Sequence, residues 1–541
     1  RIVNIEVSTI LTLNAISPLE ASGAPVFNNN PYLRLNGRGV LVGIIDTGID
    51  YLNKEFQRED DTTRIVRIWD QTIQGNKEIY SLKYGTEYTE DQINQAIRLQ
   101  ASGGDPYSIV PSKDDIGHGT RMAGIIGGRG INPDLKGAAS DCQFIIVKLS
   151  RATKVELDVA VIDKTDVPSY SPWSALLALR YIIAVARELK RPVVVFEPLG
   201  SNMGSHTGNG IVEQSINNYS TQSGTVVVVP TGNQGNTDTH TEGIIESSGD
   251  IKDIEIRVGE KQKNLPIEIW VNKPNRVKLS IISPSGEMID NLDSKNANNE
   301  RIKFLYEGTE MIVNFTSPEL STGDSHIFIR AYNLKAGIWK FRLTGQYIVE
   351  GKYYAWIPQR ELLDSETKFL NSVGYTTLTL SSTSNRAISV AYYNQEDNSV
   401  VTESGRGYTR DKMIKPDIAA GGFNAIVTNP GGGTAVISGA SVAGAVVAGC
   451  CALILQWAVT DKNYPDIYAE QIKAYIISGA KERPGDVYPN KEWGYGMFDM
   501  KGIFDRIKDT YNPRKSEDYE EYRVNNLFIR IPKSRYNRTI N

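Results

Sequence analysis

The chain has 541 residues, of which 40% are hydrophobic and 23% charged, a composition that excludes a disordered, collagenous or coiled-coil protein. Because one hydrophobic core rarely grows past about 300 residues, we expect one large domain and at least one smaller one. The 59 basic residues against 63 acidic ones give a net charge of −4, so no excess of positive charge exists to bind a nucleic acid or an anionic membrane.

Short, nearly continuous apolar runs in the first half of the chain are typical of buried parallel strands. The first run, Gly39 to Asp46, ends with a carboxylate at the strand's C-terminal end. Similar runs occur at residues 144–149, 192–196 and 225–229, and the segments between them have helical periodicity. Strands that alternate with helices predict an α/β domain, a parallel sheet flanked by helices. We assign residues 23–246 and 359–511 to this domain.

Residues 247–358 have a different pattern, with eight short alternating segments separated by turn residues such as Ser283-Pro-Ser-Gly286. This spacing predicts an antiparallel β-sandwich domain inserted into the α/β one. Residues 512–541 read as a solvated C-terminal extension that carries short apolar pieces, such as Leu527 to Ile531, able to pack on the surface.

The most apolar stretch, residues 444–459, is about 16 residues long and contains Gln456. It is shorter than the roughly 20 residues that a helix needs to cross a bilayer. We therefore predict a buried helix and no membrane span.

Only four histidines occur in the chain, and one of them has a distinctive setting. His118 lies between glycines in Gly117-His-Gly-Thr120, where a helix is expected to begin, so one edge of its ring is left open to a partner. His206, His240 and His326 lie in loop-like or strand-edge contexts, for which we expect incidental surface or hydrogen-bonding roles.

Ser441 stands where a loop of small residues enters the long apolar helix, and backbone amides at a helix N-terminus can stabilise a developing oxyanion. A serine becomes nucleophilic only with a base in reach, and that base needs an acid that fixes its tautomer. Asp46, His118 and Ser441 supply these three residue types in the order Asp, His, Ser. Taken alone, each also has a plain structural reading, since a strand-end aspartate is often a cap and such a serine is often an N-cap.

Together, the segments around these residues resemble the three active-site signatures of the subtilisin-like serine proteases. They are Ile44-Ile-Asp-Thr-Gly-Ile-Asp50, Gly117-His-Gly-Thr120 and Ser438-Gly-Ala-Ser441. The resemblance implies that Asp46 is the orienting acid, His118 the general base and acid, and Ser441 the nucleophile of an endopeptidase that acts through an acyl-enzyme.

Two further segments fit the same family. Pro230-Thr-Gly-Asn-Gln-Gly235 looks like its oxyanion-hole loop, which implies that the Asn233 amide donates to the oxyanion. The segments implied to bind the substrate next to the scissile bond comprise Pro198, Leu199, Gly200, Thr231 and Gly232.

Some residues depart from the family pattern. Ala440 replaces the usual threonine before the serine, Gly444-Ala445 replaces the usual Ala-Pro, and Pro198 replaces a serine. These changes leave open an alternative in which the chain is a pseudoprotease, a binding or signalling module that uses the cleft and the β-domain. A lipase or esterase is excluded, because it would need the chain order Ser, acid, His.

The position of the insertion, between the oxyanion-hole loop and the serine, is similar to that in the clostridial Csp proteases of spore germination, as is the stretch from Leu35 to Tyr51. The resemblance implies a jelly-roll-like insertion, a protein substrate, namely the zymogen of a spore cortex-lytic enzyme, and an extracellular or spore-associated location. The β-domain is expected either to rigidify the enzyme or to recognise a protein.

Relatives of this family are made with a propeptide. We interpret residues 1–22, which include an extended apolar stretch from Ile2 to Asn14, as a propeptide remnant or an N-terminal extension. The hypothesis places the cut just before Arg1 or between Asn14 and Gly23, with the propeptide as a partner able to stay bound non-covalently. The chemistry requires no cofactor, and the sequence leaves calcium and other metals unknown because no run has the spacing of a known calcium loop.

Overall fold

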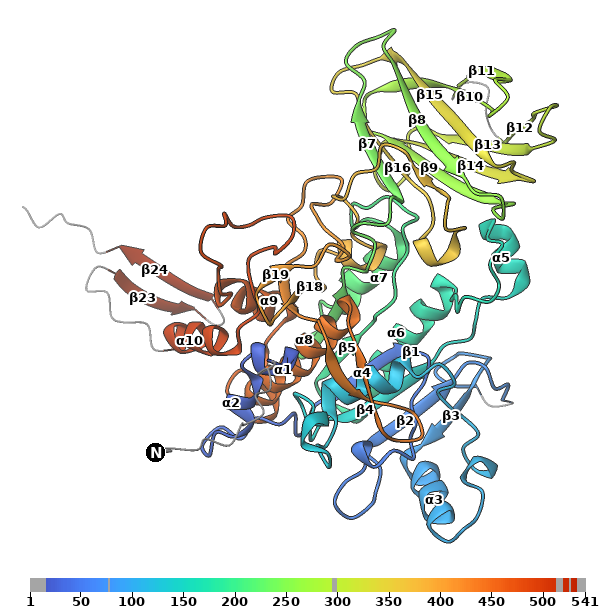
Figure 1. The fold of residues 1–541 in the computed structure, drawn as a ribbon. Helices are drawn as coiled ribbons and strands as arrows, with labels where there is room; N and C mark the ends of the chain where they lie inside the picture. Colours follow the sequence, from blue (N-terminus) through green and yellow to red (C-terminus); the bar gives the residue numbers. More distant parts are fainter. Residues whose placement is uncertain (1–15, 76–77, 294–298, 512–518, 525–526, 533–541) are drawn as a thin grey trace, which may run out of the picture.

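The computed structural model describes residues 16–75, 78–293, 299–511, 519–524 and 527–532. The apolar stretch from Ile2 to Asn14 lies outside the described residues. Two bodies are visible in Figure 1, a helix-flanked sheet and a group of antiparallel strands above it.

The larger body is built on a nine-stranded sheet of order β19-β18-β6-β5-β1-β4-β2-β3, with β20 paired to β18. Its central neighbours are parallel, whereas the edge strands β3 and β19 are antiparallel. The prediction of a parallel sheet is therefore confirmed for its centre. The strands are β1 (Leu41–Asp46), β2 (Ile65–Asp70), β3 (Thr86–Thr89), β4 (Gln143–Lys148), β5 (Val193–Phe196), β6 (Thr225–Pro230), β18 (Ile388–Asn394), β19 (Ser399–Val400) and β20 (Ile418–Gly421).

Helices cover both faces of this sheet, because successive side chains of a strand point to opposite faces. In β5, Val194 and Phe196 pack in the core beneath α4 and α8, whereas Val193 and Val195 pack beneath α6 and α7. The helices are α1 (Pro18–Ala21), α2 (Ala24–Asn28), α3 (Glu90–Ala101), α4 (His118–Gly127), α5 (Lys154–Ala160), α6 (Pro172–Leu189), α7 (Ile211–Tyr219), α8 (Ala440–Leu455), α9 (Ala469–Ser478) and α10 (Met500–Tyr511).

Helix α8 runs through the centre of the molecule. In the described part of the chain, one helical stretch, Ala440–Thr460, is long and apolar enough to cross a membrane, but 89% of its most apolar window is buried inside the protein. That burial is the arrangement of a core helix, as the sequence predicted.

The second body contains two antiparallel sheets, of order β11-β10-β15-β8-β17 and β12-β13-β14-β9-β16-β7, around a core of their own. The inserted β-domain is therefore present, and its pairing runs from His240 to Phe369, beyond the expected limits of 247 and 358 on both sides. Its strands are β7 (His240–Ile244), β8 (Ile251–Val258), β9 (Leu265–Val271), β10 (Arg276–Ile282), β11 (Met288–Leu292), β12 (Glu300–Lys303), β13 (Glu310–Thr316), β14 (Ser325–Tyr332), β15 (Gly337–Tyr347), β16 (Lys352–Trp356) and β17 (Lys368–Phe369).

Aromatic and histidine rings join the two bodies. The Trp356 ring stacks on His206 of the α/β domain at a centroid distance of 4.1 Å and on His240 at 4.4 Å. Both histidines are only 1% exposed, and each hydrogen-bonds a backbone carbonyl. Beside them, Arg410 pairs with Asp324 of the β-domain at 2.8 Å. These histidines therefore belong to the domain junction.

Two hairpins complete the description. β21 (Ala425–Thr428) and β22 (Thr434–Ile437) precede α8. In the C-terminal extension, β23 (Tyr519–Val524) and β24 (Leu527–Pro532) form an antiparallel pair that extends away from the body in Figure 1. The apolar piece at 527–531 is therefore one strand of this pair.

Candidate active site

The end of β1 and the start of α4 bring a carboxylate and an imidazole together. Asp46, the last residue of β1, is 1% exposed, and His118, the first residue of α4, places Nδ1 2.8 and 2.9 Å from its two carboxylate oxygens. Burial lowers the pKa of the His118 ring, but the charge and hydrogen bond of Asp46 outweigh it, and the pKa is raised overall. Donation from Nδ1 leaves Nε2 free to accept a proton.

Asp114 holds this pair in place and was not singled out from the sequence. Its carboxylate accepts from the backbone N–H groups of Gly117 and Thr120 and from the hydroxyls of Thr47 and Thr120, at 2.6 to 2.8 Å. The Thr47 hydroxyl in turn accepts from the Gly119 N–H at 2.9 Å. An aspartate shortly before a helix often caps the helix N-terminus. The place of Asp114 before the expected helix at His118 could therefore have identified it from the sequence.

Gly119 is required for the close approach of α4 to β1. A Cβ atom at this position would lie 2.1 Å from the Gly48 carbonyl oxygen and 3.2 Å from the Asp46 Cβ. A residue with a side chain would therefore push the helix away from the strand that carries the acid.

Ser441 is the second residue of α8 and stands two residues after Gly439. Gly439 has φ +150° and ψ 170°, a conformation open to glycine alone. Helix α8 packs against α4 and against the ends of β5 and β6, where Phe196 and Pro230 contact Gly444. Within the described residues Ser441 Oγ has no hydrogen-bond partner, so the structure joins Asp46 to His118 and leaves the serine hydroxyl free.

Asn233 lies directly beside the serine loop. Its side-chain oxygen accepts a hydrogen bond from the Ala440 backbone N–H at 3.0 Å, and a Cβ on Gly439 would stand 3.5 Å from its amide. Because the oxygen is engaged, the amide NH₂ group is the part that remains available to a ligand. The structure thus places the Asn233 side chain against Ala440, the residue before Ser441.

The two segments expected to bind the substrate lie on either side of Thr379, which the sequence analysis did not identify. The Thr379 N–H donates to the Thr231 carbonyl at 3.0 Å. Gly200 and Gly232 both face the Thr379 side chain at close range. Of the remaining predicted residues, Pro198 and Leu199 are half-buried at the end of β5. The predicted segments are therefore neighbours in space.

Two buried glutamates lie behind these segments. Glu197 accepts from the Ser381 hydroxyl at 3.3 Å, and Glu213 accepts from Thr383 at 3.4 Å. Burial raises the pKa of each carboxyl group to about 7. Both hydroxyls come from η5 (Leu380–Thr383), the short helix that follows Thr379. Two buried carboxyl groups therefore lie beside η5.

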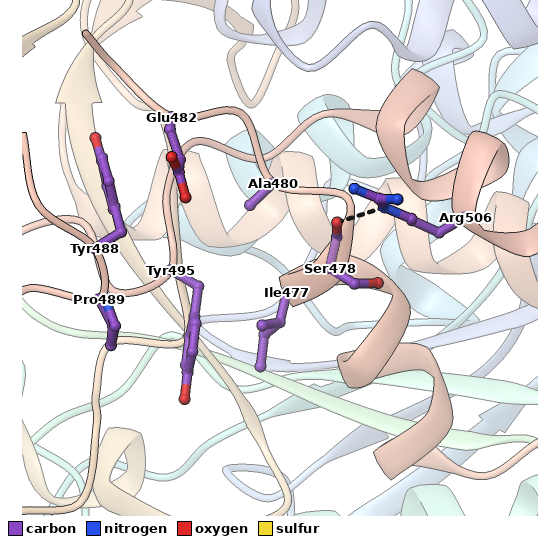
Figure 2. Close-up of a pocket in the computed structure, with 8 residues that line it drawn as sticks. All are labelled: Ile477, Ser478, Ala480, Glu482, Tyr488, Pro489, Tyr495 and Arg506. Carbon is purple, nitrogen blue, oxygen red and sulfur yellow. Dashed lines mark hydrogen bonds between the residues drawn. The ribbon is translucent and has the colours of Figure 1, made fainter.

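Figure 2 shows a separate cavity of about 420 Å³ near α9 and α10, in which Arg506 Nε donates to the Ser478 carbonyl at 2.9 Å. None of the predicted catalytic or substrate-binding residues lines it. Across the described ranges, no group of three or more His, Cys, Asp or Glu side chains is arranged to hold a metal ion.

Comparisons with known proteins agree on the fold and the family. A model described as "Subtilase family" matches residues 37–265 and 369–496. The solved structure of the CspB protease of Clostridium perfringens is similar, with a TM-score of 0.80 and 30% identity over 92% of this chain and 97% of that one.

Curated relatives are more distant and much longer. The PII-type proteinase of Lacticaseibacillus paracasei is 23% identical over 547 residues, and the PI-type proteinase of Lactococcus lactis subsp. cremoris is 22% identical over 565 residues. Each match covers 89% of this chain, which spans only 26% of the length of either relative.

Proposed function

The chain belongs to the subtilase family of proteases, and from this premise we propose that it is a serine endopeptidase with Ser441 as its nucleophile. The observation that carries the proposal is the pair formed by the buried Asp46 and the half-buried His118, hydrogen-bonded at 2.8 and 2.9 Å. It lies at the C-terminal end of the sheet, where the N-termini of α4 and α8 also converge.

The proposed reaction uses the groups in the positions described above. His118 Nε2 takes the proton of Ser441 Oγ as the oxygen attacks the scissile carbonyl, while Asp46 fixes the ring and stabilises the imidazolium that forms. The imidazolium then protonates the leaving amine, which breaks the peptide bond. Water, deprotonated by the same ring, hydrolyses the acyl-enzyme and returns the proton to Ser441.

Asn233 and the backbone N–H of Ser441 are the proposed donors to the oxyanion. The Ala440 N–H already fixes the orientation of the Asn233 amide. Loss of the usual threonine hydroxyl at position 440 therefore removes one polar group but does not remove the contact that aims the amide. This observation favours an active enzyme over a pseudoprotease.

We propose that the chain has the same biological role as the Csp proteases. The proposed substrate is a protein, specifically the zymogen of a spore cortex-lytic enzyme, and the proposed location is extracellular or spore-associated. The similarity to the CspB protease, which extends over the β-domain, supports this choice. A propeptide derived from the region before Gly23 is proposed as a second partner, and no cofactor is required for the chemistry.

Labelling with a fluorophosphonate probe tests the catalytic assignment. The wild type should be labelled, whereas Ser441→Ala and His118→Ala should not. Ser438→Ala is a matched control from the same loop, since the Ser438 hydroxyl accepts from the Asn424 N–H and has no catalytic role here. If the folded wild type with an open cleft is not labelled, the endopeptidase proposal is wrong and a binding module is the better reading.

A further inference from the structure

Gln234, the residue that follows Asn233, has a buried and hydrogen-bonded side chain. Gln234 is only 5% exposed, whereas Asn233 is an exposed residue. The side-chain oxygen of Gln234 accepts from the Arg360 backbone N–H at 3.0 Å, and its Nε2 donates to the Glu361 carboxylate at 3.1 Å. The amide group of Gln234 is therefore held through both its oxygen and its nitrogen.

The two residues that hold Gln234 belong to the β-domain. They lie in η4 (Arg360–Leu362), a turn of 3₁₀ helix between strands β16 and β17. Other contacts fix this turn independently of Gln234. The Arg360 guanidinium donates to the Thr367 carbonyl at 2.8 Å, and the Glu361 carbonyl accepts from Lys164 Nζ at 3.1 Å. η4 is thus a fixed point against which Gln234 is placed.

The backbone of this loop is anchored on either side of Asn233 and Gln234 but not at these two residues. The Gly232 carbonyl and the Gly235 N–H each make a backbone hydrogen bond of 2.9 Å to residues 403–405. Among the described residues, the N–H groups of Asn233 and Gln234 have no hydrogen-bond partner. Between the two anchors the loop therefore depends on side chains, that of Asn233 bonded to the start of α8 and that of Gln234 bonded to η4.

The direction of the Asn233 amide depends on the position of this loop. Its oxygen accepts from the Ala440 N–H at 3.0 Å, and this single bond fixes one atom of the amide group. Asn233 and Gln234 share a planar peptide unit, so a shift of Gln234 also moves the Cα atom of Asn233. A donor stabilises an oxyanion only when it lies within about 2.7 to 3.1 Å of it. Small shifts of Gln234 therefore change how well the Asn233 NH₂ group serves as that donor.

We infer that Gln234 is a positioning residue for the oxyanion hole, and that η4 of the β-domain aims the Asn233 amide through it. Gln234 acts through Asn233 and does not itself contact the reacting atoms. The inference rests on the proposed endopeptidase function, in which Ser441 is the nucleophile and Asn233 the donor. It gives the inserted domain a part in the chemistry, in addition to the two roles expected from the sequence.

The test exchanges the two hydrogen-bonding partners. Gln234→Glu places a second carboxylate next to Glu361, so the bond between the two side chains is lost. Combining it with Glu361→Gln restores one acceptor and one donor. The measurement is the second-order rate constant of fluorophosphonate labelling, because the phosphonyl oxygen takes the place of the oxyanion and no side-chain pocket is needed.

Gln234→Glu should lower the labelling rate about tenfold, since it displaces the oxyanion donor. The double variant should return to within about threefold of the wild type. Asn236→Ala is the matched control from the same loop, because the exposed Asn236 side chain bonds to Thr402 and makes no contact with η4. The control should keep the wild-type rate.

A second comparison shows whether Gln234 acts through Asn233. In a chain that already carries Asn233→Ala, Gln234→Glu should change the labelling rate by less than about twofold, because no amide is left to aim. A residue that only stabilises the fold would cost the same factor in both backgrounds. Thermal unfolding identifies any variant that does not fold. If Gln234→Glu is one of them, Gln234→Ala takes its place, with the same results expected in both backgrounds.

Three results would overturn the role of Gln234. They are a wild-type labelling rate in the folded Gln234→Glu variant, an equal loss in the Asn233→Ala background, and a double variant whose rate is not restored. All three leave the endopeptidase function standing, provided that the wild type is labelled and Ser441→Ala is not. A folded wild type that is not labelled would overturn the endopeptidase function, and this inference with it.

Discussion

Replacing Gly119 by alanine should separate the catalytic histidine from its acid. The new methyl group would lie 2.1 Å from the Gly48 carbonyl oxygen, whereas ordinary van der Waals contact begins at 3.4 Å. Because the obstacle is backbone, it cannot rotate away, and the start of α4 must retreat by about 1.3 Å. The hydrogen bonds from His118 to Asp46, now 2.8 and 2.9 Å, would then exceed the usual range.

We expect the Gly119→Ala variant to lose most of its turnover and to bind substrate almost as well as the wild type. A displacement of about 1 Å in a catalytic group lowers the rate by roughly 100-fold, so kcat/KM should fall about 100-fold with KM little changed. The same overpacking should lower the free energy of unfolding by about 1 to 3 kcal/mol.

The assay compares steady-state peptide cleavage and thermal unfolding of the wild type with Gly119→Ala and a control on the same helix, Gly124→Ala. At Gly124 the nearest neighbour of a new methyl group would be the Thr428 Cγ2 at 2.8 Å, the end of a side chain that can move. The control should retain most activity. Near wild-type turnover in a folded Gly119→Ala variant, or equal losses in both variants, would refute the argument that Gly119 sets the Asp46–His118 distance.

Three further outcomes are expected. Asp46→Asn should lower turnover by about 10⁴-fold. The acid limb of its pH–rate profile should also move to lower pH, because Asp46 raises the pKa of His118. An acid limb that stays in place would argue against the pairing of Asp46 with His118. Asn233→Ala should lower kcat by about 10²- to 10³-fold with KM little changed; a loss confined to KM would instead assign it to substrate binding. Burial lowers the pKa of His206 to about 4. Between pH 6.5 and 4 the unfolded chain therefore binds more protons than the folded one. The free energy of unfolding should fall by about 3 kcal/mol as the pH drops through this window. Denaturant unfolding at several pH values should show that slope in the wild type and a flatter one in His206→Phe, which keeps the stacking on Trp356; equal slopes would contradict the assignment.

The sequence predicts where the candidate site residues lie in the strands and helices. Asp46 follows a continuous apolar run, so its place at the end of a central strand can be read from β1 alone. His118 and Ser441 each stand where small residues meet a helix, and they are the first residue of α4 and the second residue of α8. These features depend on a few neighbouring residues, which is why the pattern of the chain is enough to find them.

Contacts between residues that are far apart in the chain cannot be predicted from the sequence in the same way. Thr379 belongs to no motif, and its contacts with Gly200 and Gly232 appear only because folding brings the three residues together. His206 looks like a loop residue in the sequence, yet Trp356 of the inserted domain covers its ring. Burial of this kind depends on how two bodies meet, which a linear pattern does not encode.

The insertion begins and ends at almost one point, and this makes the β-domain an exchangeable cassette. The last bond to the α/β domain before the insertion is from the Gly235 N–H to the Glu403 carbonyl, and at the far end of the insertion the Phe369 N–H is bonded to the Asp238 carbonyl at 2.9 Å. Because the cost of closing a loop grows slowly with its length, a short turn or a foreign domain with adjacent termini can bridge this gap. Any such graft must supply a new ring for His206, because removal of Trp356 would uncover it.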